Sequence, residues 1–304
     1  MRFQQSLVFL FLCSMGYAQT CCTATSTSQE LINPQQLEKG TLRAQLLTDY
    51  NVIDNISLNS NTSRSQTIER AIFSITSQME YSLSQRWSLG FSLPYQINTE
   101  ETSLVRLQAR GIGDLVSFVK MSDSLSQSWR YSLGIGVKVP TGETTNTSEG
   151  IIMPPTLQNG TGSTDMIFFV AVSGSPFDNP NSIVNVLLRY RKNGNSDGLA
   201  AHRVFKFGNE YELFLAYQNQ LFIFSRFIGY SVGVRTIVAE KNNINHLEDA
   251  NSGGYWLALA PQITYPISPK VGATLGTQVP LFFDLNGLQL VTRMRLNLGI
   301  TALF

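Results

Sequence analysis

Apolar and polar side chains alternate with a period of two along most of the chain, and this pattern limits the fold more than any other feature. Such alternation is typical of β-strands, whose successive side chains point to opposite faces. Beyond the N-terminal segment, the longest candidate for a continuous apolar run is 166–172, with seven residues, whereas a membrane-spanning helix needs about 20. The sequence therefore predicts an all-β fold. In the C-terminal segment one face carries Met294, Leu296, Leu298, Ile300, Ala302 and Phe304, and the other carries Arg293, Arg295, Asn297, Gly299 and Thr301.

Composition separates two all-β alternatives, a membrane barrel and a soluble exported β-sandwich. Charged residues make up 14% of the chain, against about 25% in an average soluble domain. The face opposite the apolar one is rich in Gly and Ser, whereas a sandwich would expose Lys and Glu there to bulk water. An apolar wall facing lipid and a polar lumen explain both features, so the barrel is favoured over the sandwich. The net charge of +1 gives no reason to expect a nucleic-acid partner.

The spacing of the alternating segments predicts a transmembrane antiparallel β-barrel of about twelve strands. Long connections at 51–66, 141–162, 193–202 and 240–253 alternate with short ones at 84–85, 123–128, 175–181, 218–221 and 266–269. Short turns inside the periplasm and longer external loops are typical of outer-membrane barrels, and an even number of strands places both termini in the periplasm. The expected strands are 41–50, 67–82, 86–97, 104–121, 129–140, 163–174, 182–192, 203–217, 222–239, 254–265, 270–280 and 288–304.

The N-terminus has the features of a cleavable signal peptide over residues 1–18. Arg2 supplies the positive charge, 7–13 is the apolar core, and Gly16-Tyr17-Ala18 is a small-x-small cleavage site. Residues 19–40 are expected to form a polar N-terminal arm that is periplasmic or enters the lumen, and 41–304 to form the barrel in the outer membrane of a Gram-negative cell. Lipids of that membrane are therefore expected partners. The last strand and its terminal Phe304 resemble the signal read by the barrel assembly machinery, although Ala302 departs from the usual aromatic residue.

The face opposite the apolar one carries charges of both signs, which we expect to lie in the lumen. Basic residues outnumber acidic ones by ten to three on this face when Glu80 and Lys206 are included. An open lumen of this kind favours anions, whereas in a closed one the same side chains would form salt bridges. A barrel of about twelve strands lies between the filled eight-stranded barrels and the porins with 16–18 strands. The candidate pore-lining residues are Arg43, Arg86, Arg130, Lys138, Arg189, Arg191, Glu210, Glu212, Arg235, Arg293 and Arg295.

Three glycine-containing motifs fall where strands 104–121, 129–140 and 163–174 meet the expected external rim. The first motif, which begins at Gly111, could be mistaken for a phosphate-binding loop. Such a loop needs a helix after it, and here a strand is expected to follow. Pro cannot donate to a strand ladder, so the second motif ends its strand. The rim residues are Gly111, Gly113 and Asp114, then Pro140, Thr141 and Gly142, then Gly160, Gly162 and Asp165.

The order of these motifs, Gly-x-Gly-Asp, then Pro-Thr-Gly, then Gly-Thr-Gly-Ser-x-Asp, resembles the family of outer-membrane proteins named after the MetA pathway of phenol degradation. The recognisable motifs cover 111–165, and the likeness extends over most of the barrel. The resemblance implies an outer-membrane barrel that passes small hydrophobic or aromatic compounds. It carries no catalytic residues to this chain.

Cysteine and histidine offer two further possibilities, a metal site and an enzyme. Cys21 and Cys22 could capture a soft metal ion, but two adjacent thiols without a nearby His make an incomplete site; no metal, cofactor or disulfide framework is expected. A hydrolase would depend on His202 or His246, which both fall in expected loops, where a histidine is usually only solvated. The sequence therefore favours a passive channel for small molecules, with an adhesive or envelope-structural barrel as the alternative and a hydrolase as a weaker one.

Overall fold

The computed structural model describes residues 36–54, 68–102, 104–176, 179, 181–202, 204–223, 226–287 and 289–304. The expected signal peptide, most of the expected arm, and Cys21 and Cys22 lie outside the described residues.

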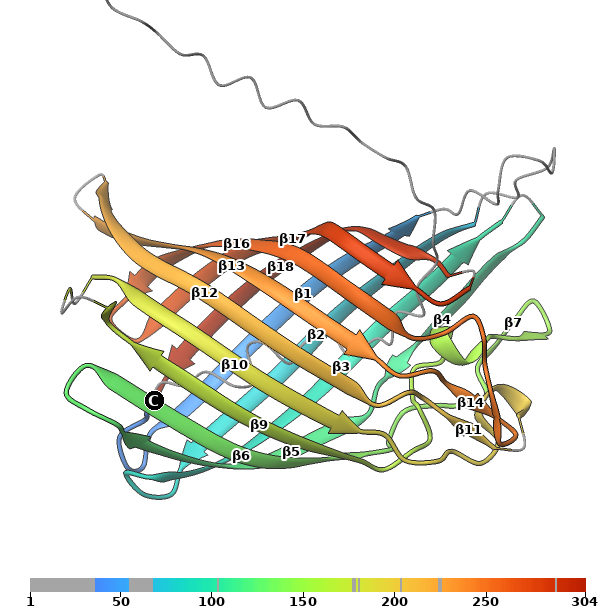
Figure 1. Ribbon diagram of the computed structural model, residues 1–304, viewed down its shortest axis with the longest axis horizontal. Coiled ribbons are helices and arrows are strands. Elements are labelled where there is room, and N and C mark those ends of the chain that lie inside the picture. The colour runs from blue at the N-terminus through green and yellow to red at the C-terminus, as the bar shows by residue number, and fades with distance from the viewer. Residues whose placement is uncertain are drawn as a thin grey trace, which may run out of the picture.

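Twelve antiparallel strands form a closed barrel (Figure 1). Neighbours in sequence pair with one another around the ring, and β1 closes it by pairing with β18 from Arg43 opposite Leu303 to Asp54 opposite Val291. The strands in ring order are β1 (Leu42–Asp54), β2 (Glu69–Ser82), β3 (Trp87–Glu101), β5 (Leu115–Ser124), β6 (Trp129–Val139), β9 (Asp165–Gly174), β10 (Ile183–Lys192), β12 (Glu210–Ile223), β13 (Arg226–Ala239), β16 (Gly254–Ser268), β17 (Val271–Leu285) and β18 (Val291–Leu303).

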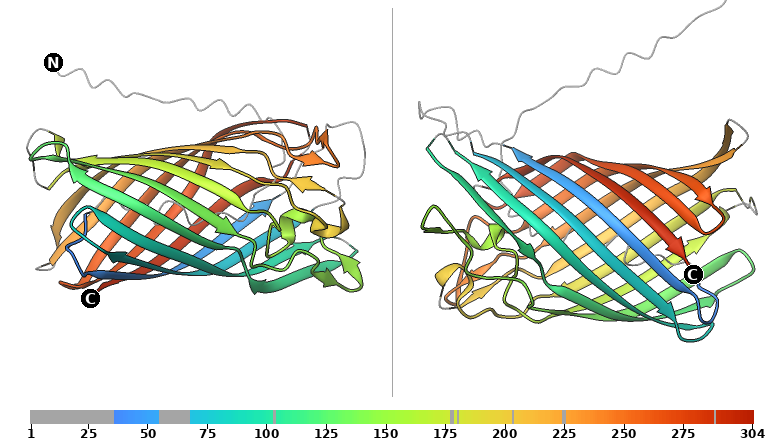
Figure 2. Two further views of the ribbon diagram at one scale, coloured as in Figure 1. Left: turned by 90° about the horizontal axis from the view of Figure 1, so that it is seen from below. Right: turned by 180° about the vertical axis from the view of Figure 1, so that it is seen from behind.

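The two ends of the barrel differ, as the alternation of long and short connections predicts. The C-terminus and the short turns lie at one end, which we call the turn end; the folded loops lie at the other, the loop end (Figures 1 and 2). In the described ranges no helix is long and apolar enough to cross a membrane. The short elements are β4 (Arg106–Ile112), β7 (Thr147–Ser148), β8 (Ile151–Ile152), η1 (Pro155–Leu157), η3 (Leu199–Ala201), β11 (Phe205–Lys206), β14 (Asn243–Ile244) and β15 (Leu247–Glu248).

Alternation along each strand divides side chains between an apolar exterior and the lumen. On β9, Phe168 and Val170 are 40% and 41% exposed on the outer face, while Phe169 and Ala171 are buried on the inner face. Large apolar side chains are exposed in the same way on every barrel strand. A soluble protein rarely leaves so continuous an apolar surface uncovered, and a lipid-facing band of this kind is typical of transmembrane barrels.

One expected strand, 203–217, starts later than the sequence suggests. The barrel strand β12 begins at Glu210, and Phe205 and Lys206 instead pair with β14 in a three-stranded sheet at the loop end. Phe205 and Phe207 are buried there rather than facing lipid. Lys206, which was expected in the lumen, lies on β11 and not on a barrel strand. The loop joins the barrel wall at Gly208, just before β12. A Cβ added to Gly208 would lie 1.8 Å from the Glu240 carbonyl oxygen.

The expected turn at 218–221 is also wrong. β12 continues to Ile223 and pairs with β13 through to Arg226, so the connection is two residues long. Three polar residues resemble a turn in the sequence, namely Gln218, Asn219 and Gln220. They lie near the turn end of the barrel, where a strand can carry polar side chains without an energetic cost.

The fourth expected strand, 104–121, is broken at Gly113 and Asp114. β5 pairs with the first half of β3 and with β6, whereas β4 pairs with the second half of β3 and leaves the ring as a thirteenth strand of the sheet. Because β6 ends at Val139, no barrel strand continues beside β4. The segment 140–164 occupies this place, and β7 contacts β4.

Candidate functional site

The lumen is the candidate functional site, and its inner surface carries most of the buried charges. Eight basic and six acidic residues are buried in the described part of the chain, so the basic excess is smaller than the sequence suggests. Asp49, Asp114 and Asp165 supply counter-charges missing from the expected set of lumen charges. Asp49 shares the parity of Arg43 on β1, and this signal could have identified it.

The structure divides the sequence-predicted lumen charges into a buried and an exposed group. Arg86 lies in the turn before β3, with its Nε 3.0 Å from the Asp123 carboxylate. Arg130 is exposed at the start of β6, and Arg293 is exposed next to a β-bulge between β1 and β18. The buried group, with each member in an ion pair, is Arg43, Lys138, Arg189, Arg191, Glu210, Glu212, Arg235 and Arg295.

Near the turn end, one carboxylate serves two cations. Glu80 accepts a hydrogen bond from Arg43, and its other oxygen lies 2.6 Å from Lys120 Nζ and 2.6 Å from Ser88 Oγ. All four side chains are buried. A buried charge is tolerated when it is paired and hydrogen-bonded, as these are. The cluster links four successive strands of the ring, β1, β2, β3 and β5.

A second charged cluster lies nearer the loop end, on β10, β12 and β13. Glu212 is 2.5 Å from Arg189 Nη2 and 2.8 Å from Arg235 Nε, so two guanidinium groups share its carboxylate. Arg191 Nη2 lies 2.5 Å from Glu210. The shared carboxylate leaves a positive excess of one on this part of the wall.

The three glycine-containing motifs meet around Lys138. Its Nζ lies 3.2 Å from Asp114 Oδ2 and 2.5 Å from Asp165 Oδ2, and it also donates to Thr161 Oγ1. We call Asp114, Lys138 and Asp165 the Asp–Lys–Asp cluster. All three are buried, and they come from the break after β4, the end of β6 and the start of β9.

The Asp–Lys–Asp cluster holds the segment 140–164 through backbone contacts. Asp114 Oδ1 accepts from Gly142 N at 3.1 Å, and its Oδ2 accepts from Thr161 N at 2.9 Å and from Thr161 Oγ1 at 2.7 Å. Gly142 and Gly160 touch, since a Cβ on Gly160 would lie 2.2 Å from the Gly142 carbonyl oxygen. The rim motifs therefore fasten one loop to the wall.

Further contacts fold this segment against β3 and β4. Asn98 Nδ2 donates to the Leu157 carbonyl at 3.0 Å, and Met153 and Leu157 are fully buried against Leu107 and Ala109. At its start, the hydroxyl of Thr145 and backbone N–H groups of the same turn donate to Glu143 and hold the pKa of this carboxyl below its usual range.

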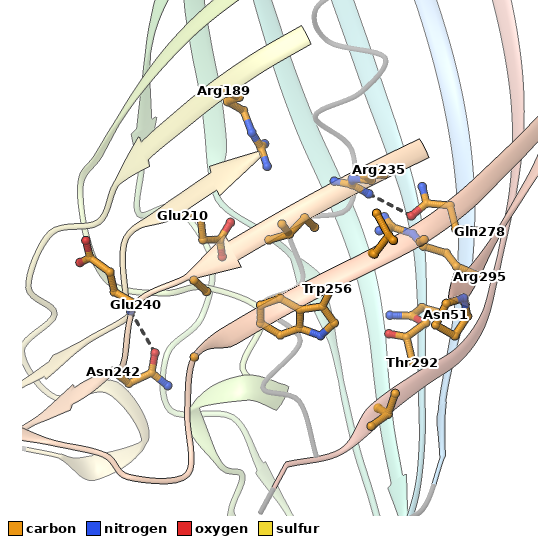
Figure 3. A pocket seen from close by; sticks show the side chains of 18 residues that line it. Asn51, Arg189, Glu210, Arg235, Glu240, Asn242, Trp256, Gln278, Thr292 and Arg295 are labelled. Atoms are coloured by element: carbon orange, nitrogen blue, oxygen red, sulfur yellow. Dashed lines mark hydrogen bonds between the residues drawn. The ribbon is translucent and has the colours of Figure 1, made fainter. Parts of the chain in front are cut away.

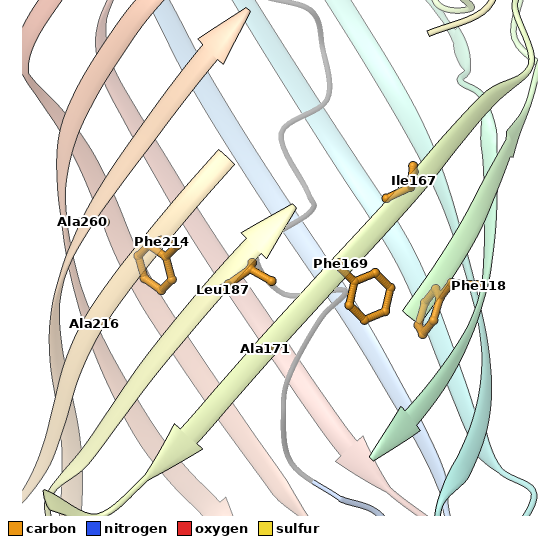
Figure 4. Close-up of a cluster of buried hydrophobic side chains, with 8 residues drawn as sticks. All are labelled: Phe118, Ile167, Phe169, Ala171, Leu187, Phe214, Ala216 and Ala260. Carbon is orange, nitrogen blue, oxygen red and sulfur yellow. The ribbon is translucent and has the colours of Figure 1, made fainter. Parts of the chain in front are cut away.

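An apolar strip on the inner wall was not expected from the sequence. It runs across β5, β9, β10, β12 and β16 (Figure 4). Strands β2 and β3, which follow β5 around the ring on its other side, carry polar inner faces instead. Its rings lie against glycines of adjacent strands: a Cβ on Gly134 would meet Phe169 at 2.0 Å. The strip comprises Phe118, Ile167, Phe169, Ala171, Leu187, Phe214, Ala216 and Ala260.

A hollow of about 1020 Å³, which includes space open to solvent, lies between β10, β12, β13, β16, β17 and β18 (Figure 3). Its charged wall includes Arg189, Arg235 and Arg295, and Trp256 projects into it from β16. Arg295 Nε donates to Asp49 Oδ2 at 2.6 Å, and Arg235 Nη1 donates to Gln278 Oε1 at 3.1 Å. The hollow therefore combines cationic, amide and aromatic groups.

The histidines of the hydrolase alternative lie in separate loops. His202 follows η3 with its ring 5.7 Å from that of Phe205, and His246 is exposed in the turn between β14 and β15. Among the described residues, no group of three or more His, Cys, Asp or Glu side chains is placed to hold a metal ion. Neither arrangement resembles a nucleophile with its base.

Comparisons by sequence find no matching family and no matching curated protein. Among solved structures, the chain is similar to an outer-membrane channel from Pseudomonas putida F1, with a TM-score of 0.69 and 13% identity, over 90% of this chain and 98% of that one. The β domain of a Bordetella autotransporter matches with a TM-score of 0.48 and 9% identity over 88% and 100% of the chains. The Ralstonia pickettii toluene transporter matches with 0.45 and 8% over 88% and 90%. The likeness to the Pseudomonas channel, over nearly the whole of both chains, shows a shared barrel fold.

Proposed function

We propose that this protein is a passive channel for small molecules in the outer membrane of a Gram-negative cell. The observation that carries the proposal is the inner wall: an apolar strip borders a polar surface on β2 and β3, with a charged hollow near the loop end. A barrel that served only as a membrane anchor would not need an interior with separate apolar, polar and charged surfaces. The apolar exterior supports the membrane location.

Hydrophobic or aromatic compounds are the cargo we infer. The apolar strip offers a surface on which such a compound exchanges water for apolar contacts, which is favourable in proportion to the area covered. The motifs at 111–165 add the resemblance to the family named after the MetA pathway of phenol degradation, and the fold is compatible with it. Assembly through the barrel machinery and the last strand is part of the same proposal.

Liposome swelling tests the channel function directly. The mature protein, refolded in lipid and checked by heat-modifiable gel migration, should make liposomes permeable to small solutes, and planar bilayers should show discrete conductance steps. Empty liposomes and heat-unfolded protein serve as controls. Folded protein that admits no solute and carries no current would contradict the proposal.

An adhesive role is the second candidate, and one observation favours it. In the described part of the loop end, Leu199, Phe205 and Phe207 form a small buried core together with the sheet of β11, β14 and β15. A rigid external surface suits protein contacts. Binding of cells or matrix proteins by liposomes that carry the barrel, lost on replacing loop residues 193–209, would support this role.

A further inference from the structure

The hollow near the loop end contains an arginine whose hydrogen-bonding capacity is only partly used. Arg295 is 9% exposed, and its Nε is committed to Asp49. Its Nη2 is buried and has no hydrogen-bond partner in the described structure. Leaving a buried charged donor unsatisfied is costly, so a ligand oxygen at this position would be stabilising.

An acceptor beside Arg295 is also unused. The Asn51 Oδ1 atom on the neighbouring strand β1 is buried without a partner in the described part of the chain, and Asn51 lines the same hollow. An amide side chain can supply a donor from its nitrogen while its oxygen meets a ligand hydroxyl or water. Arg295 and Asn51 together therefore offer directional contacts to one small polar group.

The electrostatic field in the hollow favours an anion. Arg189 and Arg235 share the single carboxylate of Glu212, which leaves one positive charge in excess on this wall. Of the acidic residues that line the hollow, Glu210 is paired with Arg191. Glu240 accepts from the uncharged groups of Asn209 and Tyr211, but it is exposed, so solvent screens its charge. A cationic ligand would meet buried carboxylates that are already paired with guanidinium groups, whereas an anion meets the positive excess of the buried wall.

Another part of the lining is apolar and includes a flat surface. Trp256 projects into the hollow, and Ile237, Leu257 and Pro280 line it as well (Figure 3). Indole rings bind flat apolar groups by stacking and by the large area that they cover. A ligand for this hollow therefore has a planar apolar body on one side and a single anionic group on the other.

The apolar strip continues from the hollow toward the turn end. On β12, Glu212 is followed on the same face by Phe214, and on β16, Trp256 is followed by Ala260. The apolar body of a ligand held at the arginines would thus lie next to the apolar strip, along which it could move toward the turn end.

We propose that this hollow is a binding site for small aromatic carboxylates, with the carboxylate on Arg295 and the ring on Trp256. The site deepens the channel function and depends on it for its role, because it would select the cargo that enters the lumen. Arg235 and Arg189 supply the field that draws the anion, and the amide nitrogens of Gln278 and Asn51 can donate hydrogen bonds that orient it.

Tryptophan fluorescence tests this site independently of transport. The chain has three tryptophans, and Trp87 and Trp129 both lie at the turn end. A Trp87→Phe, Trp129→Phe variant in detergent micelles therefore reports on Trp256. Adding sodium benzoate should quench its fluorescence to saturation, whereas sodium chloride at equal ionic strength should not, and benzyl alcohol should bind about tenfold more weakly or worse because it lacks the charge.

Substitution of the arginine gives the second arm. Arg295→Gln should raise the Kd for benzoate about tenfold or more. An Asp49→Asn, Arg295→Gln variant, which leaves no unpaired carboxylate, should do the same and guards against misfolding of the single variant. Arg130→Gln, which removes one positive charge at the turn end, is the matched control and should leave the Kd unchanged.

Four outcomes would overturn the proposal. These are equal affinity for benzyl alcohol and benzoate, unchanged affinity in both Arg295 variants, an equal loss in Arg130→Gln, or no heat of benzoate binding by calorimetry on the unaltered chain. Benzoate binding by a protein that admits no solute into liposomes would contradict the channel function alone. Swelling without benzoate binding would contradict this site alone.

Discussion

Lys138 shows how much a single buried cation can hold together in this barrel. It lies between the carboxylates of Asp114 and Asp165, with 4% of its side chain exposed. Lys138→Met would leave two buried carboxylates facing each other without their cation. Breaking a buried ion pair in this way costs about 3–5 kcal/mol, and we expect a loss of that size in urea titrations of the refolded protein.

The matched control is Lys241→Met at the loop end. Lys241 Nζ lies 3.6 Å from Glu248, but the two side chains are 39% and 69% exposed. Exposed pairs contribute about 0–1 kcal/mol because water and salt screen them. Equal losses in the two variants would show that the burial of Lys138 has no energetic consequence.

Gly134 is a residue whose absent side chain makes room for a neighbour. A Cβ there would lie 2.0 Å from the ring of Phe169, so Gly134→Ala must displace the ring into the lumen or distort the wall. Overpacking of this kind costs about 1–3 kcal/mol, measurable in the same urea titrations. Gly272→Ala, whose Cβ meets no atom closer than 3.9 Å, should be nearly neutral. A Phe169→Leu change should rescue the Gly134→Ala variant, and failure to do so would contradict the ring contact as the cause.

At the scale of elements, the segment 140–164 replaces a missing stretch of barrel strand beside β4. Asp114 holds it by accepting from Gly142, Thr161 and Lys138. Asp114→Asn removes the negative charge and one acceptor, so the segment should open more often. Cleavage at the exposed Glu149 by a Glu-specific protease should therefore accelerate, because proteolysis follows the population of opened segments.

Asp123→Asn is the control for this experiment, since Asp123 lies in the turn-end half of β5 and pairs with Arg86. Its cleavage rate at Glu149 should equal that of the unaltered protein. An Asp114→Asn variant that is cut no faster would show that the segment is held by its apolar contacts at Met153 and Leu157 alone.

The sequence predicts most barrel strands because alternation is a local property with a strong physical cause. β2, β6, β9 and β10 agree with their expected ranges within two residues at each end. The exceptions depend on tertiary contacts: Gly208 ends the ladder before β12 because it packs on Glu240, and Asp114 breaks β4 from β5 by binding the next loop. Neither partner is near in sequence, so period-two reasoning could not find them.

For the lumen charges, too, the position on a strand could be predicted from local sequence, whereas the partner could not. Parity along each strand identifies Arg189, Arg235 and Arg295 as candidates for the inner face, where the structure places them. Which carboxylate each one meets depends on the register between strands. Phe169 and Phe214 have the parity of the inner face too, but a polar lumen was expected, and only the glycines opposite the rings explain their presence.

At the scale of the whole molecule, the barrel has an apolar outer surface and a lumen that is apolar on one side and polar on the other. A solvent-filled pore needs only a polar interior, and a membrane anchor needs only the apolar exterior. The strip from Phe118 to Ala260 fulfils neither need. Its presence beside the arginines of the hollow is the reason why we propose amphipathic cargo rather than simple ions.

The apolar exterior makes one prediction about the whole fold. Val170 lies in the middle of β9, 41% exposed on the outer face. If this face contacts lipid, Val170→Arg should destabilise insertion into vesicles by about 2–4 kcal/mol, the cost of an arginine near the midplane of a transmembrane barrel. Refolding yields, scored by heat-modifiable migration against urea concentration, measure this cost.

The control is Leu247→Arg, which introduces the same charge on a residue that is 74% exposed in β15 at the loop end. Water solvates the charge there, so this variant should refold like the unaltered chain. If both variants insert equally well, the outer face does not contact hydrocarbon, and the transmembrane location of this barrel is wrong.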